Sequence, residues 1–340
     1  MIDLHIHLGG AVPSSVLWEI LCDNGLRTTF RDFDAFHDSM TVDPDEVKSL
    51  DDFLGSYFSV TELIQSSPAA ASVSAYQLVA KAYRRAQIEA VEMRYNPMKR
   101  MRENVHTLEA IILATTQGLE RASMHYNVAT GIILSMGRDL SLENNWKIAE
   151  AACAWHSRGA LHGAHGVVGL DVAGPESGRK EFYDTWLKEV AAMFEKARSV
   201  GLGTTYHIGE TDHTGVEGIE RVLDTVQPDR IGHGIALRKA DDKTFDRLAD
   251  KLKERGVLLE ICPSVNLITK SIADLAELAA FLKRLHAAHV PFNLNTDNPY
   301  LIHTNLKQEY DLMAEALGQD AGLLGACHEA GRKASFLKGD

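Results

Sequence analysis

The chain has 340 residues, of which 45% are hydrophobic and 24% are charged, as in an ordinary globular protein. Its 35 basic and 47 acidic residues give a net charge of −12, which argues against general binding to nucleic acid or to an anionic membrane. The four cysteines form no CxxC pair, and the sequence shows neither a signal-peptide pattern nor an apolar run of about 18 residues. These features predict a cytoplasmic protein with reduced thiols.

Eight short runs rich in branched apolar residues predict β-strands over 2–8, 90–96, 127–135, 166–174, 203–209, 230–234, 257–263 and 291–297. The segments between them carry apolar residues at helical spacing, for example over 16–25, 106–126 and 181–201. Such alternation favours a parallel sheet covered by helices. Because eight strands close a (β/α)8 barrel, we expect residues 1–340 to form a single α/β barrel domain of the TIM type. A doubly wound open sheet is the competing fold, but no GxGxxG motif follows an early strand.

The connection between the first two predicted strands is longer than one crossover needs. It covers about residues 26–88 and contains an apolar helical segment at 51–67. We therefore expect extra helices here. The 51–67 helix either packs on the barrel or acts as a lid over the C-terminal ends of the strands.

The opening stretch MIDLHIHLGG places two histidines on the first predicted strand. His5 and His7 are two residues apart, so both imidazoles face the same side of the strand. Two neutral imidazoles directed at one point suit a metal ion. The alternative is a pair of buried histidines that bond to backbone carbonyls.

Three further polar residues end other predicted strands: His207, His233 and Asp297. In a closed barrel the C-terminal ends of the strands meet on one face. Three imidazoles and one carboxylate match a catalytic zinc site that keeps a position for water, so we assign one Zn²⁺ per chain to His5, His7, His207 and Asp297. His233 is then a fourth imidazole ligand, a histidine bonded to the loop backbone or, as we prefer, a base that orients the metal-bound hydroxide.

Glu210 follows His207 by three residues, at the mouth of the expected site. A carboxyl group there can deliver a proton to a substrate, provided that a dry pocket keeps it protonated near pH 7. The alternative is a helix N-cap or first-turn carboxylate, because ETDHTG leads toward the next predicted helix.

Six sequence blocks resemble those of one enzyme family, in the same order, from residue 3 to about residue 300: DLHIHLGGA, VVGLDVAGPE, TYHIGE, RIGHG, LEICPSVNLIT and LNTDNP. The family is that of the adenosine and adenine deaminases, zinc-dependent aminopurine deaminases of the amidohydrolase superfamily. The resemblance implies a (β/α)8 barrel, the same four zinc ligands and hydrolytic replacement of a ring amino group with release of ammonia. It also implies that Glu210 protonates a ring nitrogen, that His233 acts on the metal-bound hydroxide, and that the Gly174 N–H meets purine N3 unless Gly174 is a simple turn glycine.

Two positions depart from the family pattern. Gly9 stands where adenosine deaminases usually carry an aspartate that holds the ribose 5′-hydroxyl and adenine deaminases a glutamate, so we expect open space there. Asn298 stands where a second aspartate usually hydrogen-bonds purine N7. An amide can donate to an unprotonated N7, so a purine can still bind.

The leading hypothesis is a zinc-dependent hydrolase that deaminates adenosine or a related 6-aminopurine nucleoside. Gly9 motivates an alternative, a 5′-modified nucleoside such as aminodeoxyfutalosine, and Asn298 motivates another amino-heterocycle. A non-purine metal-dependent amidohydrolase would keep the ligands but have little need for Glu210. An inactive relative that serves as a binding module is disfavoured, because the ligands, Glu210 and His233 are all retained.

Overall fold

A computed structural model describes the chain except for residues 25, 27, 104, 159–162 and 338–340. Eight strands form one sheet in which each strand pairs in parallel with the next along the chain. The strands are β1 (Ile2–His7), β2 (Ala90–Tyr95), β3 (Ala129–Gly137), β4 (Ala164–Ala173), β5 (Gly203–Ile208), β6 (Arg230–His233), β7 (Leu258–Ile261) and β8 (Phe292–Leu294). Each of them overlaps one of the eight predicted runs.

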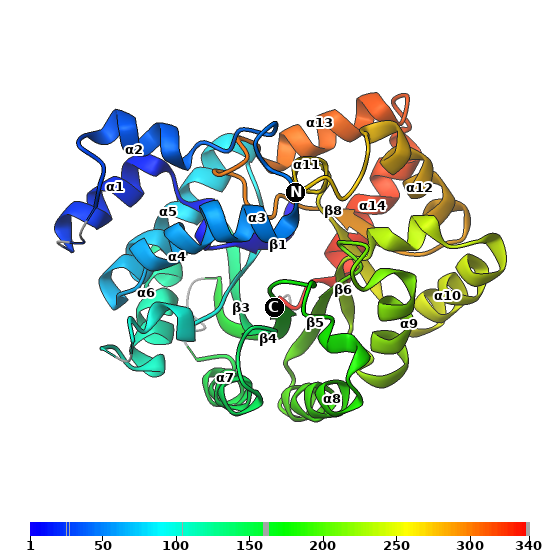
Figure 1. Cartoon of the computed structure of the whole chain (residues 1–340), viewed down its shortest axis with the longest axis horizontal. Helices are drawn as coiled ribbons and strands as arrows, with labels where there is room; N and C mark the ends of the chain where they lie inside the picture. The colour runs from blue at the N-terminus through cyan, green and yellow to red at the C-terminus, as the bar shows by residue number, and fades with distance from the viewer. Residues whose placement is uncertain (25, 27, 104, 159–162, 338–340) are drawn as a thin grey trace.

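The sheet closes where the residues after β8 return to β1. Ile6 forms a parallel bridge with Asp297, the His7 N–H donates to the Asp297 carbonyl at 2.7 Å, and the Asp297 N–H donates to the His5 carbonyl at 2.8 Å. These bonds complete a ring of strands surrounded by helices (Figure 1). The predicted (β/α)8 barrel is therefore confirmed, and the open doubly wound sheet is wrong.

The helices cover the outside of the ring (Figure 1). Several begin at a residue whose side chain accepts a backbone N–H of the first turn, as Ser67 does from Ala70 and Thr107 from Ala110. The helices are α1 (Ser14–Asp23), α2 (Phe33–Met40), α3 (Leu50–Phe53), α4 (Ser59–Ile64), α5 (Pro68–Ala86), α6 (Leu108–His125), α7 (Leu142–Trp155), α8 (Asp184–Ser199), α9 (Gly215–Thr225), α10 (Asp242–Arg255), α11 (Pro263–Ile268), α12 (Leu275–Ala287), α13 (Leu306–Ala316) and α14 (Ala321–Ala334). The three helices predicted over 16–25, 106–126 and 181–201 correspond to α1, α6 and α8, although residue 25 lies outside the described residues.

The connection from β1 to β2 holds helices α1 to α5, so the expected extra helices are confirmed. The segment predicted at 51–67 is a continuous helical stretch made of α3, the π-helical turn η2 (Leu54–Phe58) and α4. Short 3-10 turns also follow several strands: η1 (Gly9–Ala11), η3 (Met98–Arg100), η4 (Lys180–Phe182) and η5 (Ile235–Lys239).

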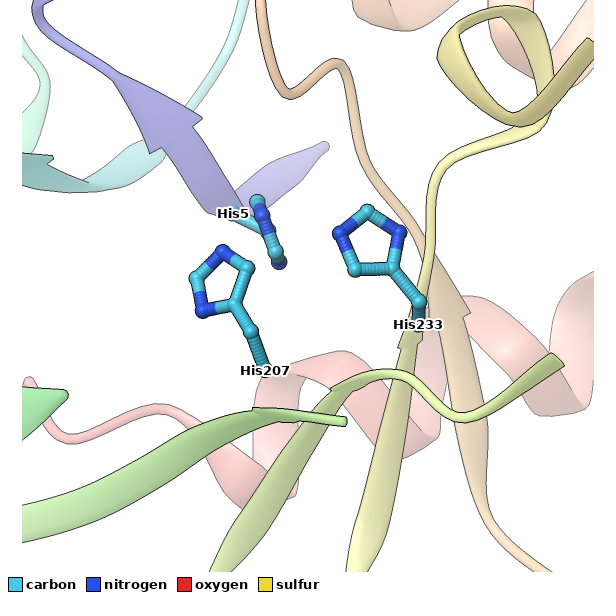
Figure 2. Close-up of side chains that lie close together, drawn as sticks. All are labelled: His5, His207 and His233. Atoms are coloured by element: carbon cyan, nitrogen blue, oxygen red, sulfur yellow. The ribbon is translucent and has the colours of Figure 1, made fainter. Parts of the chain in front are cut away.

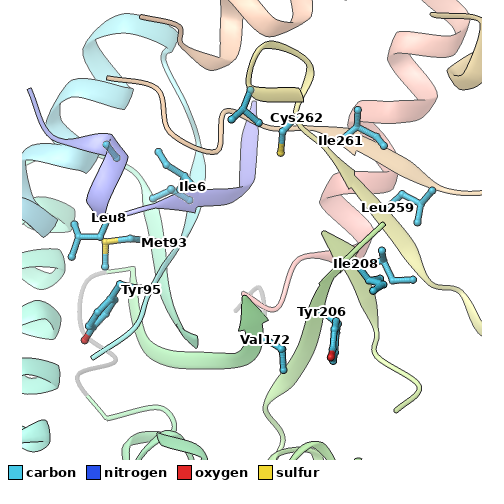
Figure 3. Close-up of a cluster of buried hydrophobic side chains, with 14 of the residues drawn as sticks. Ile6, Leu8, Met93, Tyr95, Val172, Tyr206, Ile208, Leu259, Ile261 and Cys262 are labelled. Atoms are coloured by element: carbon cyan, nitrogen blue, oxygen red, sulfur yellow. The ribbon is translucent and has the colours of Figure 1, made fainter. Parts of the chain in front are cut away.

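Side chains alternate between the two faces of the barrel wall. His5, His207 and His233 turn toward one another from β1, β5 and β6 (Figure 2). Their neighbours along the strands, among them Ile6 and Tyr206, belong instead to the apolar core shared with the helices (Figure 3). This period of two places polar groups inside the ring and apolar groups against the helices.

In the described part of the chain, no helix combines the length and apolarity needed to cross a bilayer. All four cysteines carry free thiols, and Cys262 and Cys327 are buried.

Candidate active site

A cavity of about 430 Å³ opens at the C-terminal ends of the strands, where barrel enzymes bind their substrates. Seven of the predicted site residues line it: His7, Gly174, His207, Glu210, His233, Asp297 and Asn298. His5 lies behind these residues and is fully buried, and Gly9 does not line the cavity. The structure therefore brings together residues from β1, β4, β5 and β6 and from the end of β8.

The three predicted histidine ligands converge through their Nε2 atoms. The Nε2 of His7 lies 3.3 Å from that of His5 and 3.1 Å from that of His207. The Asp297 carboxylate is the fourth group, with Oδ1 at 3.5 Å from His7 Nε2 and 3.9 Å from His5 Nε2. His7 Nε2 thus lies within 3.5 Å of a donor atom from each of the other three residues.

Carboxylates behind two of these rings fix which nitrogen carries the proton. The Nδ1 of His5 lies 2.8 Å from Glu260 Oε2, and the Nδ1 of His207 lies 3.0 Å from Asp171 Oδ1. Because an ionised carboxylate only accepts hydrogen bonds, each Nδ1 is protonated and each Nε2 presents a lone pair. The lone pairs of His5 and His207 both lie close to His7 Nε2, at 3.3 Å and 3.1 Å, so the three nitrogens can share one cation.

The donor set fits a divalent metal ion. Two nitrogens bound tetrahedrally to zinc at about 2.0–2.1 Å are themselves separated by roughly 3.3 Å, close to the spacing seen here. Burial, together with the nearby Arg94 and the other imidazoles, holds the pKa of His5 well below its usual range. Burial also lowers the pKa values of His7 and His207, so all three imidazoles are neutral, as metal ligands must be.

Asp297 and His233 both lie in unusual backbone conformations. Their φ angles are 59° and 62°, in the left-handed region that side chains other than glycine seldom occupy. Such conformations cost free energy and are concentrated at functional sites. Burial also raises the pKa of Asp297 to about 8, and the Asn298 side-chain amide donates a hydrogen bond to its carboxylate.

Glu210 stands beside this group on the loop after β5. Its pKa is raised well above 4.5 by burial first and by the charges of Asp297 and Glu176 next, so its carboxyl group is protonated at higher pH than an exposed glutamate. The Glu176 carboxylate holds the loop by accepting the Glu210 N–H at 3.2 Å and the Thr211 N–H at 2.8 Å. The N-cap alternative for Glu210 is wrong, because α9 begins only at Gly215.

His233 faces the carboxylates through its Nε2 atom, which lies 3.5 Å from Glu210 Oε2 and 3.8 Å from Asp297 Oδ2. The Nδ1 atom on the other side of the ring lies 3.1 Å from the side-chain nitrogen of Asn266. Because an amide nitrogen only donates, this contact makes Nδ1 the acceptor and leaves the proton on Nε2. The partner of His233 Nδ1 is therefore the side chain of Asn266 on α11. The alternative role, a histidine bonded to the backbone of its loop, required a backbone carbonyl in this place.

Gly174 follows β4 with a φ of 95°, a conformation that favours glycine. Its carbonyl accepts a hydrogen bond from Arg138 Nη1 at 2.8 Å. This bond holds the backbone of Gly174 at the cavity wall.

The interpretation of Gly9 as open space is wrong. A Cβ built on Gly9 would lie 2.6 Å from the ring of Phe58 and 3.1 Å from the hydroxyl of Thr61. Phe58 therefore occupies the place of a side chain at position 9, and its ring centroid lies 5.7 Å from that of His7 at an interplanar angle of 90°. The sequence contained no signal for this contact, because it depends on how η2 folds back over β1.

Three residues behind the site were not singled out from the sequence: Asp171, Glu260 and Cys262. Asp171 and Glu260 hold the rings of His207 and His5, and Cys262 lies within reach of His5 and Asp297. The sequence did contain a signal for Asp171 and Glu260, because each is a single acidic residue within an apolar strand, in LDV and LEI. A buried charge requires a partner, so such residues are candidates for supporting a site.

Charged residues lie around the outer part of the cavity. Lys99 Nζ is 2.9 Å from Asp139 Oδ2 and 3.7 Å from Glu62 Oε2, and all three residues line the cavity. The α3–η2–α4 segment contributes further lining residues, among them Asp51 and Phe58. The 51–67 segment is thus part of the cavity wall.

Comparison with known proteins shows which family the chain resembles. The family model described as adenosine deaminase matches residues 1–340. An adenosine deaminase of Clostridium perfringens is 26% identical over 310 residues, covering 91% of this chain and 86% of the relative. An aminodeoxyfutalosine deaminase of Acidothermus cellulolyticus is 29% identical over 339 residues, covering 96% and 86%.

Among solved structures, the adenine deaminase of Arthrobacter aurescens shares the fold with a TM-score of 0.83 at 18% identity, covering 100% of this chain and 94% of that one. The full-length match and the convergence of imidazole and carboxylate side chains at the cavity lead to one assignment. The chain belongs to the adenosine deaminase family and is a metal-dependent hydrolytic deaminase.

Proposed function

We propose that this enzyme removes the ring amino group of adenosine or a related 6-aminopurine nucleoside, consuming water and releasing ammonia. The observation that carries the proposal is the buried carboxyl group of Glu210 beside the donors of His7, His207 and Asp297 on one cavity, with His5 directly behind them. Relatives that match along most of the chain are named as deaminases of adenosine and of aminodeoxyfutalosine, which supports the substrate class.

We assign one Zn²⁺ to His5, His7, His207 and Asp297. Imidazole-rich sites of low coordination number favour zinc over magnesium or calcium, which prefer oxygen ligands. When bound, the ion would lower the pKa of a water molecule, so that hydroxide is available for the attack near neutral pH.

Glu210 is the proposed acid. An aminopurine resists addition of water because addition breaks the aromaticity of the ring. Protonation of a ring nitrogen by Glu210, as the water oxygen adds to the amine-bearing carbon, prevents negative charge from building up on the ring. The raised pKa of Glu210 keeps this proton available.

His233 is proposed to orient the attacking water and not to bind the metal. The contact of Asn266 with Nδ1 leaves Nε2 as a donor directed at the carboxylate side of the site. A donor N–H can hold a water oxygen, whereas a metal ligand needs a lone pair.

The proposed substrate contacts are the backbone N–H of Gly174 for purine N3 and the amide of Asn298 for N7. The amide nitrogen of Asn298 has two hydrogens, so one can serve Asp297 and the other the ring. A 5′-modified nucleoside is the second candidate, because the apolar ring of Phe58 replaces a polar side chain at position 9.

An ammonia-release screen with the zinc-loaded enzyme tests the proposal. The panel is adenine, adenosine, 2′-deoxyadenosine, AMP, aminodeoxyfutalosine and methylthioadenosine, and the control is Glu210→Gln loaded with zinc. We expect release from at least one nucleoside and very little from the control. No release from any aminopurine by a fully loaded enzyme would refute the proposal and favour a non-purine amidohydrolase.

A further inference from the structure

The segment that follows α14 turns inward and enters the ring of strands at the ends opposite the cavity. Figure 1 shows this red segment passing from α14 into the ring beside β4 and β5. Three glycines on β3, β4 and β5 make room for it. A Cβ on Gly203 would lie 2.2 Å from the Phe336 ring, one on Gly169 3.0 Å from it, and one on Gly131 2.7 Å from Leu337.

The segment is tied to buried charges inside the barrel. The Ser335 hydroxyl and the Phe336 N–H donate to Glu92 Oε1 at 2.7 Å and 2.6 Å. The Arg230 guanidinium lies 3.7 Å from the centroid of the Phe336 ring, and its Nη1 donates to the Ala334 carbonyl at 3.2 Å. Polar, cation–π and packing contacts thus all fix this one turn of chain.

The same charges lead to the metal site. Arg230 forms ion pairs with Glu92 Oε2 at 2.7 Å and with Glu260 Oε1 at 2.8 Å. The other oxygen of Glu260 lies 2.8 Å from His5 Nδ1. Glu92, Arg230, Glu260 and His5 are all completely buried, so water can replace none of these contacts.

We propose that residues 335–337 form a floor segment, and that Ser335 and Phe336 within it position the metal ligand His5 through Glu92, Arg230 and Glu260. This inference rests on the proposed metal site. The contacts of Ser335 and Phe336 fix the positions of Glu92 and Arg230. Arg230 in turn holds one oxygen of Glu260, so that the other oxygen faces His5. Ser335, Phe336 and the members of this chain of ion pairs are positioning residues, since none of them touches the substrate, whereas the Leu337 side chain packs against Gly131.

The physical reason is the cost of an unpaired charge in a dry interior. When Ser335 and Phe336 no longer hold them, Glu92 and Arg230 stay paired and shift together, and Glu260 shifts with Arg230. A displaced Glu260 no longer holds the proton on Nδ1 of His5. Loss of such supporting contacts typically weakens metal binding by about 10–100-fold.

The test measures zinc affinity in the full-length, metal-free protein by competition with a chromophoric chelator. The variants are Ser335→Ala, which removes one bond to Glu92, and Phe336→Leu, which removes the ring from Arg230. The packing control is Leu337→Ala, which loosens the floor without touching the ion pairs. The surface control is Lys333→Ala. The Lys333 side chain is 76% exposed, and its only ion pair among the described residues is with Glu329. Thermal unfolding is measured in parallel.

We expect the apparent Kd for Zn²⁺ to rise about tenfold in Ser335→Ala and in Phe336→Leu, and to stay within about twofold of the parent in both controls. In a Glu92→Gln background, Ser335→Ala should add little further loss, because both changes act through the same carboxylate.

Unchanged affinity in folded Ser335→Ala and Phe336→Leu would overturn the inference. So would an equal loss in Leu337→Ala, which would indicate a general packing effect. If Phe336→Leu does not fold, the apparent Kd for Zn²⁺ of the milder Ser335→Ala variant still tests the inference. A parent protein that takes up no Zn²⁺ would instead refute the proposed metal site itself.

Discussion

Arg94 links the two carboxylates that hold the buried histidines. Its Nη2 donates to Glu260 Oε2 and lies 2.8 Å from it, and its Nη1 lies 3.7 Å from Asp171 Oδ2. One guanidinium thus gives both carboxylates a charged partner in a fully buried environment. The imidazoles of His5 and His207 then have acceptors behind them and lone pairs in front, which prepares the site before any metal arrives.

Removing the proposed acid without disturbing the donor set separates proton donation from metal binding. Glu210→Gln keeps the size of the side chain but has no proton to give. We expect kcat to fall about 10²–10⁴-fold. Zinc content per chain, measured by elemental analysis, should stay at the parent value. Turnover close to that of the parent would show that another group supplies the proton.

The convergence of the histidines and Asp297 was predictable from the sequence, but the residues that support them were not assigned. His5 and His7 share a strand face by spacing alone, and His207, His233 and Asp297 end predicted strands, so a barrel brings them together. Asp171 and Glu260 needed knowledge of which side chain faces which ring across the barrel. The contact between Gly9 and Phe58 depends on a fold of the chain that no local pattern encodes.

At the scale of elements, the α3–η2–α4 segment shapes the outer cavity. A π-helical turn at Leu54–Phe58 interrupts its regular helix, a feature often found at functional sites. This turn directs Phe58 onto Gly9 and His7. The apolar pattern of the segment predicted a helix, but could not say whether it covered the site or packed elsewhere.

Restoring a carboxylate at position 9 tests the role of this segment in substrate choice. Gly9→Asp alone must displace the Phe58 ring, so we expect the full effect only with Gly9→Asp combined with Phe58→Ala. A charged hydrogen bond to the 5′-hydroxyl should then raise kcat/KM for adenosine relative to methylthioadenosine by about tenfold. Phe58→Ala alone is the control. An unchanged ratio in the double variant would mean that this corner does not contact the 5′ substituent.

Helix α13 is attached to the start of α11 by a buried carboxyl group. Glu309 Oε2 accepts the Ser264 N–H at 3.1 Å, and burial raises the pKa of Glu309 above 4.5. The folded state therefore binds this proton more tightly than the unfolded chain does. The free energy of unfolding should fall as the pH rises from 4.5 through the folded-state pKa.

Glu309→Gln cannot titrate and should lose this part of the pH dependence. Its stability relative to the parent should improve as the pH rises from 5 to 8, measured by urea unfolding. Glu315→Gln, exposed on the same helix, is the matched control and should show a constant difference. A constant difference for Glu309→Gln as well would contradict the buried, protonated state.

At the scale of the whole molecule, the interior of the barrel is charged. Barrels of this type usually fill their centre with branched apolar residues, whereas this one places Glu92, Arg94, Arg230 and Glu260 there. The positions of the strands were predictable because each strand is a nearly continuous apolar run. The charged interior was not, because it required deciding which alternate residue of every strand points inward. Since one closed sheet holds all eight strands, we propose that residues 1–340 form a single domain.

The converging imidazole and carboxylate donors come from strands at both ends of the chain and lie in a dry interior, so a cation that binds them should stabilise the entire barrel. A ligand that binds only the folded state at 100 times its Kd adds about 2.7 kcal/mol to the free energy of unfolding. For a chain of this size we expect Zn²⁺ to raise Tm of the metal-free enzyme by about 4 °C, measured by calorimetry. Mg²⁺ at the same concentration should have little effect, because three of the four donors are nitrogens. Asp297→Ala should bind less zinc and show a smaller shift. An equal shift with Mg²⁺ would show that a nitrogen-rich site does not stabilise the barrel. Full zinc stoichiometry in Asp297→Ala would show that Asp297 is not a ligand.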